Sequence, residues 1–206
     1  MTIIQDIESV VGEKGLITGK DVFNRKAGIW IDDGIRADAI VRPKDTLELS
    51  RVLAICNENK QAVIPHGGLT GLAEGAITQR GQIAISSERL TSIEEVDEIG
   101  RTMTLQAGVP LEKAQEEAEK YNLMLPVDLG ARGSCTVGGN ISTNAGGNMV
   151  IKYGMMRDSV LGLEAVLADG QVMTSMNQML KNNSGYDLKQ LFIGTEGTLG
   201  YVSKAV

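Results

Sequence analysis

The stretch SCTVGGNISTNAGGN, residues 134–148, combines four glycines with small polar residues and few large side chains. It is too polar for a buried strand, and its glycines disfavour a stable helix. A soluble protein with so bare a backbone has either a flexible linker there or a segment that another molecule approaches closely. The distribution of glycine along the chain separates these two interpretations.

The 25 glycines among 206 residues gather in three places, around 67–75, 130–147 and 194–200. A linker composition would spread them more evenly. Each cluster adjoins an expected strand or helix end, where bare N–H groups can converge on phosphate oxygens. The segment GLITGKD (15–21) fails the P-loop pattern, and the chain contains no G-x-G, so the two common nucleotide motifs are absent. Three clusters together favour a long, extended ligand.

The composition excludes several classes of protein. A net charge of −6 and 3% aromatic residues argue against a general nucleic-acid binder. Cys56 and Cys135 lie far apart without metal-ligand spacing, so we expect no metal site and no disulfide framework. The N-terminus has no basic region of a secretory signal, and no apolar run approaches the roughly 20 residues of a membrane span. We therefore expect a cytoplasmic protein without a transmembrane segment.

Hydrophobic patterning predicts a chain of mixed helices and strands. We expect helices over 2–11, over most of 44–60 and from Pro110 onward. We expect strands at 37–43, 62–65, 82–86 and 101–108, with a strand and turn within 89–100. A β-hairpin turning at Asp169-Gly170 follows, and then a short helix and a final strand after 182. For the helix after 44, both Asp45 and Thr46 fit the capping position.

Five motifs resemble one family when they are taken in order. They are PHGGLTGL (65–72), LPVDLGARGSCTVGGNISTNAGG (125–147), KYG (152–154), VLGLEAVLADG (160–170) and NNSGYDLKQLFIGTEGTLG (182–200). From about residue 38 onward the chain resembles the FAD-binding domain of the vanillyl-alcohol oxidase and p-cresol methylhydroxylase type. Within that family it is most similar to the D-2-hydroxy-acid dehydrogenases, which act on 2-hydroxyglutarate, lactate or glycolate.

The resemblance implies an α+β fold in two lobes with FAD extended between them. A small parallel-sheet lobe would cover about 1–90, and a larger antiparallel-sheet lobe would cover about 91–206. The backbone would be bare because diphosphate and flavin lie against it, and Cβ atoms would collide with them. The cofactor-binding residues implied by the family are Pro65, His66, Gly67, Gly68, Leu69, Thr70, Gly71, Leu72, Pro126, Asp128, Gly133, Ser134, Gly138, Gly139, Asn140, Thr143, Asn144, Gly146, Glu196, Gly197 and Gly200.

Two positions bear on how FAD would be held. Leu69 stands where some relatives carry a histidine bonded to the flavin, and Cys135 lies one position away from the cysteine that others use. The resemblance therefore implies non-covalent FAD. Glu74 stands where most relatives have a small residue, often glycine, so an acid near the diphosphate is expected to weaken binding.

Several residues keep two interpretations. His66, the only histidine, either caps its loop or contacts the diphosphate, and we nominate no catalytic residue. The side chains of Asp128, Thr143 and Asn144 either contact the cofactor or satisfy the loop backbone. Glu196 either bonds the cofactor or caps a turn. The cations Arg132 and Lys152 either offset diphosphate charge or remain solvated.

The expected function follows from the resemblance. Full-length relatives carry a substrate domain after this region, and no part of it is recognisable here, so the chain alone is expected not to turn over. In the parent enzyme, hydride would pass from a small D-2-hydroxy acid to FAD, and the electrons would leave to a separate acceptor. The alternative is a stand-alone FAD-binding module that needs a partner. An apolar face left by a missing domain would favour self-association or docking of a partner domain.

Overall fold

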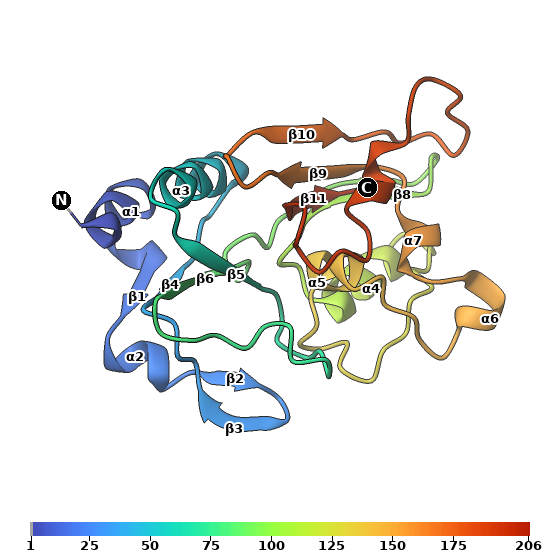
Figure 1. The fold of residues 1–206 in the computed structure, drawn as a ribbon. Helices are drawn as coiled ribbons and strands as arrows, with labels where there is room; N and C mark the ends of the chain where they lie inside the picture. The colour runs from blue at the N-terminus through green and yellow to red at the C-terminus, as the bar shows by residue number, and fades with distance from the viewer. Residues whose placement is uncertain (1) are drawn as a thin grey trace.

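The computed structural model describes residues 2–206 and contains two main β-sheets with helices packed around them (Figure 1). The four-stranded sheet has the order β1-β4-β6-β5, in which β4, β6 and β5 are parallel and β1 is antiparallel. The five-stranded sheet is antiparallel, with the order β10-β9-β11-β8-β7. This arrangement confirms the expected α+β fold with one small, mostly parallel sheet and one larger antiparallel sheet.

The strand bounds are β1 Leu16–Thr18, β2 Lys26–Gly28, β3 Ile31–Gly34, β4 Ala39–Val41, β5 Ala62–His66, β6 Gln82–Ser86, β7 Ile93–Asp97, β8 Thr102–Gln106, β9 Leu163–Val166, β10 Val172–Ser175 and β11 Tyr201–Ala205. The helices are α1 Ile3–Val11, α2 Lys20–Phe23, α3 Thr46–Glu58, α4 Leu111–Glu119, α5 Val137–Ser142, α6 Val150–Tyr153 and α7 Met156–Ser159, with 3-10 turns η1 Glu13–Gly15 and η2 Leu188–Leu191. Strands β2 and β3 form a separate hairpin.

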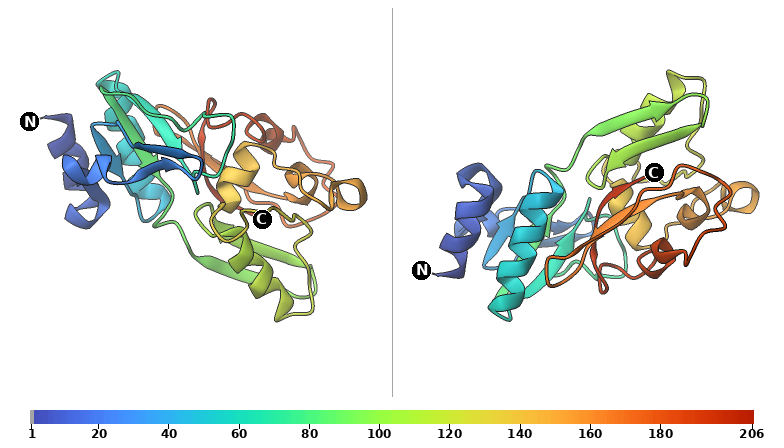
Figure 2. Two further views of the ribbon diagram at one scale, coloured as in Figure 1. Left: turned by 90° about the horizontal axis from the view of Figure 1, so that it is seen from below. Right: turned by 90° about the horizontal axis from the view of Figure 1, so that it is seen from above.

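The helices of the parallel-sheet lobe begin at clear capping signals. Thr2 and Gln5 form a capping box at the start of α1. At α3 the cap is Asp45, whose carboxylate accepts the N–H of Glu48 at 2.8 Å. The hydroxyl of Thr46 instead donates to Glu164 at 2.6 Å, and this bond ties α3 to β9. In Figure 2, α1 and α3 lie beside each other on one side of the parallel sheet.

The two lobes share a core. Val166 of β9 and Tyr201 of β11 pack in the same buried cluster as Leu49 of α3 and Ile85 of β6. The buried Tyr201 hydroxyl lies 3.2 Å from the carbonyl oxygen of His66 and 3.3 Å from that of Ile85. Burial strongly raises the pKa of Tyr201, so the phenol stays protonated and donates to these carbonyls. The end of β5 is therefore fastened to the antiparallel sheet.

The stretch 134–148 contains a helix, so the expectation that its glycines prevent one is wrong. Thr136 caps α5 by accepting the N–H of Gly139 at 3.3 Å, and Ile141 is fully buried. The N–H of Gly138 donates to the carbonyl oxygen of Ala107 at 2.7 Å. A Cβ built on Gly138 would lie 2.5 Å from the Cβ of Ala107. Tertiary packing therefore stabilises a helix that intrinsic propensity does not favour.

Candidate functional site

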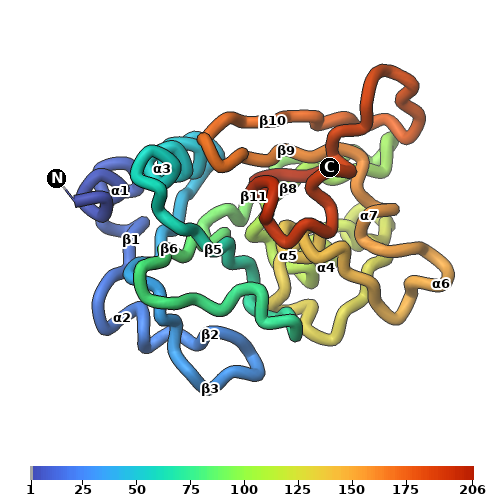
Figure 3. The backbone as a smooth tube through the Cα atoms, viewed as in Figure 1, coloured from blue at the N-terminus to red at the C-terminus, as the bar shows by residue number. Residues whose placement is uncertain are grey.

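The three glycine-rich segments meet in space. A Cβ built on Gly68 would lie 1.9 Å from the carbonyl oxygen of Ser134, and one built on Gly75 would lie 2.7 Å from Oε2 of Glu196. The N–H of Glu196 donates to the carbonyl oxygen of Ser142 at 2.8 Å. Figure 3 shows the chain running from β5 toward the region of α5 before it returns to β6. One surface region therefore contains segments from both lobes.

The residues expected to bind the cofactor all lie on these segments. Pro65 and His66 end β5, and Gly67, Gly68, Leu69, Thr70, Gly71 and Leu72 follow it; Pro126, Asp128, Gly133 and Ser134 lie between α4 and α5; Gly138, Gly139 and Asn140 lie in α5; Thr143, Asn144 and Gly146 follow α5; Glu196, Gly197 and Gly200 precede β11. Their role in cofactor binding stays a prediction.

The loop Gly67–Ala76, here called the 67–76 loop, leaves its backbone donors unused. Within residues 2–206, no backbone N–H from Gly67 through Ala76 donates a hydrogen bond to a protein acceptor. The loop follows the carboxyl end of a parallel strand, which is where open α/β sheets bind ligands. Backbone N–H groups need partners, and consecutive free ones in a tight loop form an anion-binding concavity.

The loop contains two strained residues and is held at both ends by His66. Leu69 and Glu74 have φ values of 55° and 60°, in the left-handed region that non-glycine residues seldom adopt. The buried His66 ring places Nε2 at 2.9 Å from the carbonyl oxygen of Ala76. Burial lowers the pKa of His66, so the ring is neutral and Nε2 donates to that carbonyl. His66 thus joins the two ends of the loop.

The glycines do not all serve one purpose. A Cβ on Gly147 would lie 1.9 Å from the carbonyl oxygen of Asp128, and Gly138 is equally blocked by Ala107. At these two positions the expectation that a cofactor explains the bare backbone is wrong, because neighbouring protein segments fill the space. Gly71 differs, since a Cβ there would meet no atom within 4 Å. Gly130, at the start of the second glycine-rich segment, is open in the same way.

Polar side chains after α5 are engaged within the protein. The hydroxyl of Thr143 donates to the carbonyl oxygen of Gly139 at 3.0 Å. Asn144, with φ of 48°, accepts the N–H of Arg157 on its Oδ1 at 3.0 Å. These bonds favour the second of the two interpretations of Thr143 and Asn144, in which they satisfy the local backbone.

Three of the charged residues named from the sequence, Asp128, Arg132 and Lys152, have protein contacts. Arg132 donates to the Asp128 carboxylate at 3.0 Å and lies 3.6 Å from Glu112. The ammonium of Lys152 lies 4.8 Å from the centroid of the Tyr153 ring. Asp128 and Arg132 therefore neutralise each other to a large extent. Within residues 2–206, no group of three or more His, Cys, Asp or Glu side chains could hold a metal ion.

Sequence analysis missed Arg157. Its guanidinium donates from Nη2 to the carbonyl oxygen of Ile193 at 2.7 Å and from Nη1 to the side chain of Gln190. Among residues 2–206 it has no carboxylate within 4 Å. The sequence offers only a weak signal for it, an arginine placed between two glycine-rich segments.

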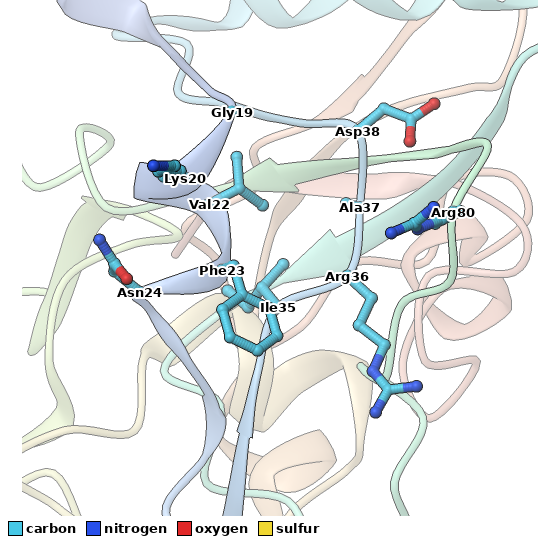
Figure 4. A pocket seen from close by; sticks show the side chains of 10 residues that line it. All are labelled: Gly19, Lys20, Val22, Phe23, Asn24, Ile35, Arg36, Ala37, Asp38 and Arg80. Carbon is cyan, nitrogen blue, oxygen red and sulfur yellow. The ribbon is translucent and has the colours of Figure 1, made fainter.

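A large surface hollow of about 780 Å³ lies away from this region, near the amino ends of β4 and β6. In Figure 4, Phe23 occupies its middle, while Lys20 and Arg80 lie on opposite sides. The two cations do not converge on a common point. None of the glycine-rich segments lines this hollow, so it is separate from the candidate site.

The comparisons identify the family. The family described as FAD binding domain matches residues 37–175, and the chain belongs to this family. The chain is similar to p-cresol methylhydroxylase, a solved structure with substrate bound, at a TM-score of 0.80 and 21% identity over 98% of this chain and 42% of that one. This match confirms the expected fold type.

Two curated relatives indicate the branch of the family. A mitochondrial D-2-hydroxyglutarate dehydrogenase of Danio rerio is 47% identical over 81% of this chain and 31% of its own length. A Schizosaccharomyces pombe protein named as a mitochondrial D-lactate dehydrogenase is 39% identical over 98% of this chain and 40% of its own length. Over its FAD-binding region, the chain is thus similar to D-2-hydroxy-acid dehydrogenases. It spans about a third of the length of these relatives.

Proposed function

We propose that the chain is the FAD-binding part of a dehydrogenase that oxidises a small D-2-hydroxy acid to the 2-oxo acid. The observation that carries this proposal is the run of unpaired N–H groups from Gly67 to Ala76 at the carboxyl end of β5. The substrate class is supported by the two relatives, whose names specify D-2-hydroxyglutarate and D-lactate.

The residues present fit an extended dinucleotide. The N–H groups of the 67–76 loop that have no acceptor within residues 2–206 would hold the diphosphate, because backbone N–H groups donate well to an anion. Gly71 leaves room for close approach, as no protein atom lies within 4 Å of a Cβ built there. Bound FAD would supply the hydride acceptor, while the protein binds and orients it. In this chain, His66 and Tyr201 hold the beginning of the loop in place.

We propose that FAD is held without a covalent bond. Leu69 offers no group that could bond to the flavin. Cys135 is buried, and its sulfur lies 3.6 Å from the side-chain amide nitrogen of Asn140. Burial raises the pKa of Cys135, so the residue stays a thiol at neutral pH and is a weak nucleophile.

Turnover would need more than this region. We propose that a substrate domain, in the same chain or in a partner, completes the site and that a separate acceptor removes the electrons. Docking of such a domain, self-association and a cytoplasmic location all stay predictions. Within residues 2–206, no helix is long and apolar enough to cross a membrane.

An absorption spectrum and an FAD titration test the cofactor. Flavin bands at about 370 and 450 nm that acid releases into solution would support the non-covalent site. Absence of binding at micromolar FAD would contradict it.

The substrate class is tested by mixing D-2-hydroxy acids anaerobically with the full-length enzyme. Bleaching near 450 nm by a D but not an L enantiomer is expected, and no bleaching by any of them would contradict the dehydrogenase.

A further inference from the structure

We infer that Arg157 is a positioning residue for the cofactor site, because it joins the second glycine-rich segment to the third. The contacts of Arg157 are observed within the protein itself. The expected effect of Arg157 on cofactor binding rests on the proposed function. Arg157 lies in the single-turn helix α7, outside the glycine-rich segments themselves.

The main chain of Arg157 holds one of these segments. Its N–H donates to Oδ1 of Asn144 at 3.0 Å. Asn144 has φ of 48°, a left-handed conformation that local side-chain bonds help a residue with a Cβ to keep. The side-chain amide of Asn144 also lies 3.8 Å from the sulfur of Met155. The sharp turn after α5 is therefore fixed from α7.

The guanidinium of Arg157 holds the other segment. It donates to the carbonyl oxygen of Ile193 at 2.7 Å and to the side chain of Gln190. A Cβ built on Gly194 would lie 3.5 Å from Nη2 of Arg157 and 3.4 Å from the Cβ of Asn144. The planar fork of arginine suits several acceptors in fixed positions, which the single ammonium of lysine does not.

The contacts of Arg157 bear on the cofactor site through the segment that follows Ile193. Gly194 and Glu196 donate their N–H groups to the carbonyl oxygens of Ile141 and Ser142. The Glu196 side chain reaches the 67–76 loop at Gly75. Loss of the Arg157 fork would leave the segment that carries Glu196 held by these two backbone bonds, so its local openings would become more frequent. Because no carboxylate of residues 2–206 pairs with Arg157, its charge also favours an anion nearby.

The test compares Arg157→Gln and Arg157→Lys with Arg51→Gln, which changes an exposed arginine of α3. Amide hydrogen exchange is measured first on the FAD-free proteins. Arg157→Gln is expected to speed exchange at residues 190–197 at least about tenfold while β9 and α3 keep their protection. Arg157→Lys should give a smaller effect, and Arg51→Gln should give none.

FAD titration of the same proteins provides the second measurement. Arg157→Gln should weaken FAD binding about tenfold to hundredfold, with partial rescue in Arg157→Lys. Unchanged exchange at 190–197, or faster exchange across both lobes, would overturn the inference. If the wild-type protein bound no FAD, the proposed function would fail, and the exchange data would still decide the role of Arg157.

Discussion

The 67–76 loop and the stretch 134–148 look alike in sequence but differ in the structure. Both are rich in glycine and poor in large side chains. In the stretch 134–148, most backbone N–H groups find protein acceptors, and Gly138 and Gly147 admit a neighbouring backbone. In the 67–76 loop, no N–H donates within the described protein, and Gly71 faces open space. Gly138 and Gly147 therefore serve packing, as Gly68 does in the loop, whereas Gly71 leaves space beside the unpaired N–H groups.

The largest predicted effect is on the stability of the packed segment. Gly138→Ala would place a Cβ 2.5 Å from the Cβ of Ala107, so we expect the free energy of unfolding to fall by about 3 kcal/mol. Gly71→Ala is the matched control, since its Cβ meets no protein atom within 4 Å. Urea unfolding of both variants measures the difference. Equal stability of the two would refute the distinction between the segments.

The same control variant should separate function from fold. Gly71→Ala is expected to weaken FAD binding by about tenfold, because its Cβ takes space that the open loop leaves for the diphosphate. Its stability should remain within about 0.5 kcal/mol of the wild type. Fluorescence titration with FAD provides the measurement. Wild-type affinity in Gly71→Ala would show that the open side of the loop does not face the cofactor.

Glu74 allows backbone strain and charge to be separated within the loop. With φ of 60°, Glu74 is strained, and its exposed carboxylate lies on the loop that we propose to hold the diphosphate. Glu74→Gly should stabilise the protein by about 0.5–1 kcal/mol and tighten FAD binding. Glu74→Gln removes only the charge, so it should tighten binding without changing stability. Thermal unfolding and FAD titration of both variants report the two effects, and weaker binding in either would count against the placement of the phosphate.

The remaining prediction is a pH dependence of stability at His66. Burial depresses the pKa of His66 below the usual 6.5. As the pH falls, the imidazole therefore binds a proton more readily in the unfolded chain than in the folded one. Stability from this group is complete above pH 6.5 and falls as the pH drops, by at most about 1.4 kcal/mol per pH unit.

His66→Gln should remove this slope between pH 7 and pH 5, as urea unfolding at several pH values can measure. Glu88 does not interfere in that range. Its burial opposes ionisation, but its bonds to Arg25 and Arg42 prevail and hold its pKa below 4.5, so its contribution is lost only below that value. An identical slope in wild type and His66→Gln would contradict the neutral, buried ring.

The sequence predicted the regular elements well where apolar periodicity was long or a turn signal was sharp. Helices α1 and α3 and the hairpin of β9 and β10 around Gly170 were anticipated. The short strand β1, the hairpin of β2 and β3, and the short helices α2, α6 and α7 were not. These elements are three or four residues long, so no periodic pattern can develop in them, and contacts with distant residues stabilise them.

The sequence predicted which segments form the candidate site, but not the contacts that hold them together. Glycine clustering and motif order located the three segments that meet. Helix α5 was missed because its stability comes from Ala107 and Val109, residues of another segment whose carbonyl oxygens accept from it. The bridging role of Arg157 was missed because its partners, Asn144 and Ile193, lie on either side of it at long sequence distance.

Amide hydrogen exchange with and without FAD tests the central claim most directly. The account predicts that FAD slows exchange at residues 67–76, because the diphosphate accepts N–H groups that have no protein partner. Exchange in α5 should change little, since its amides already bond to protein carbonyls. Protection that appears in α5 while residues 67–76 stay unchanged would contradict the account.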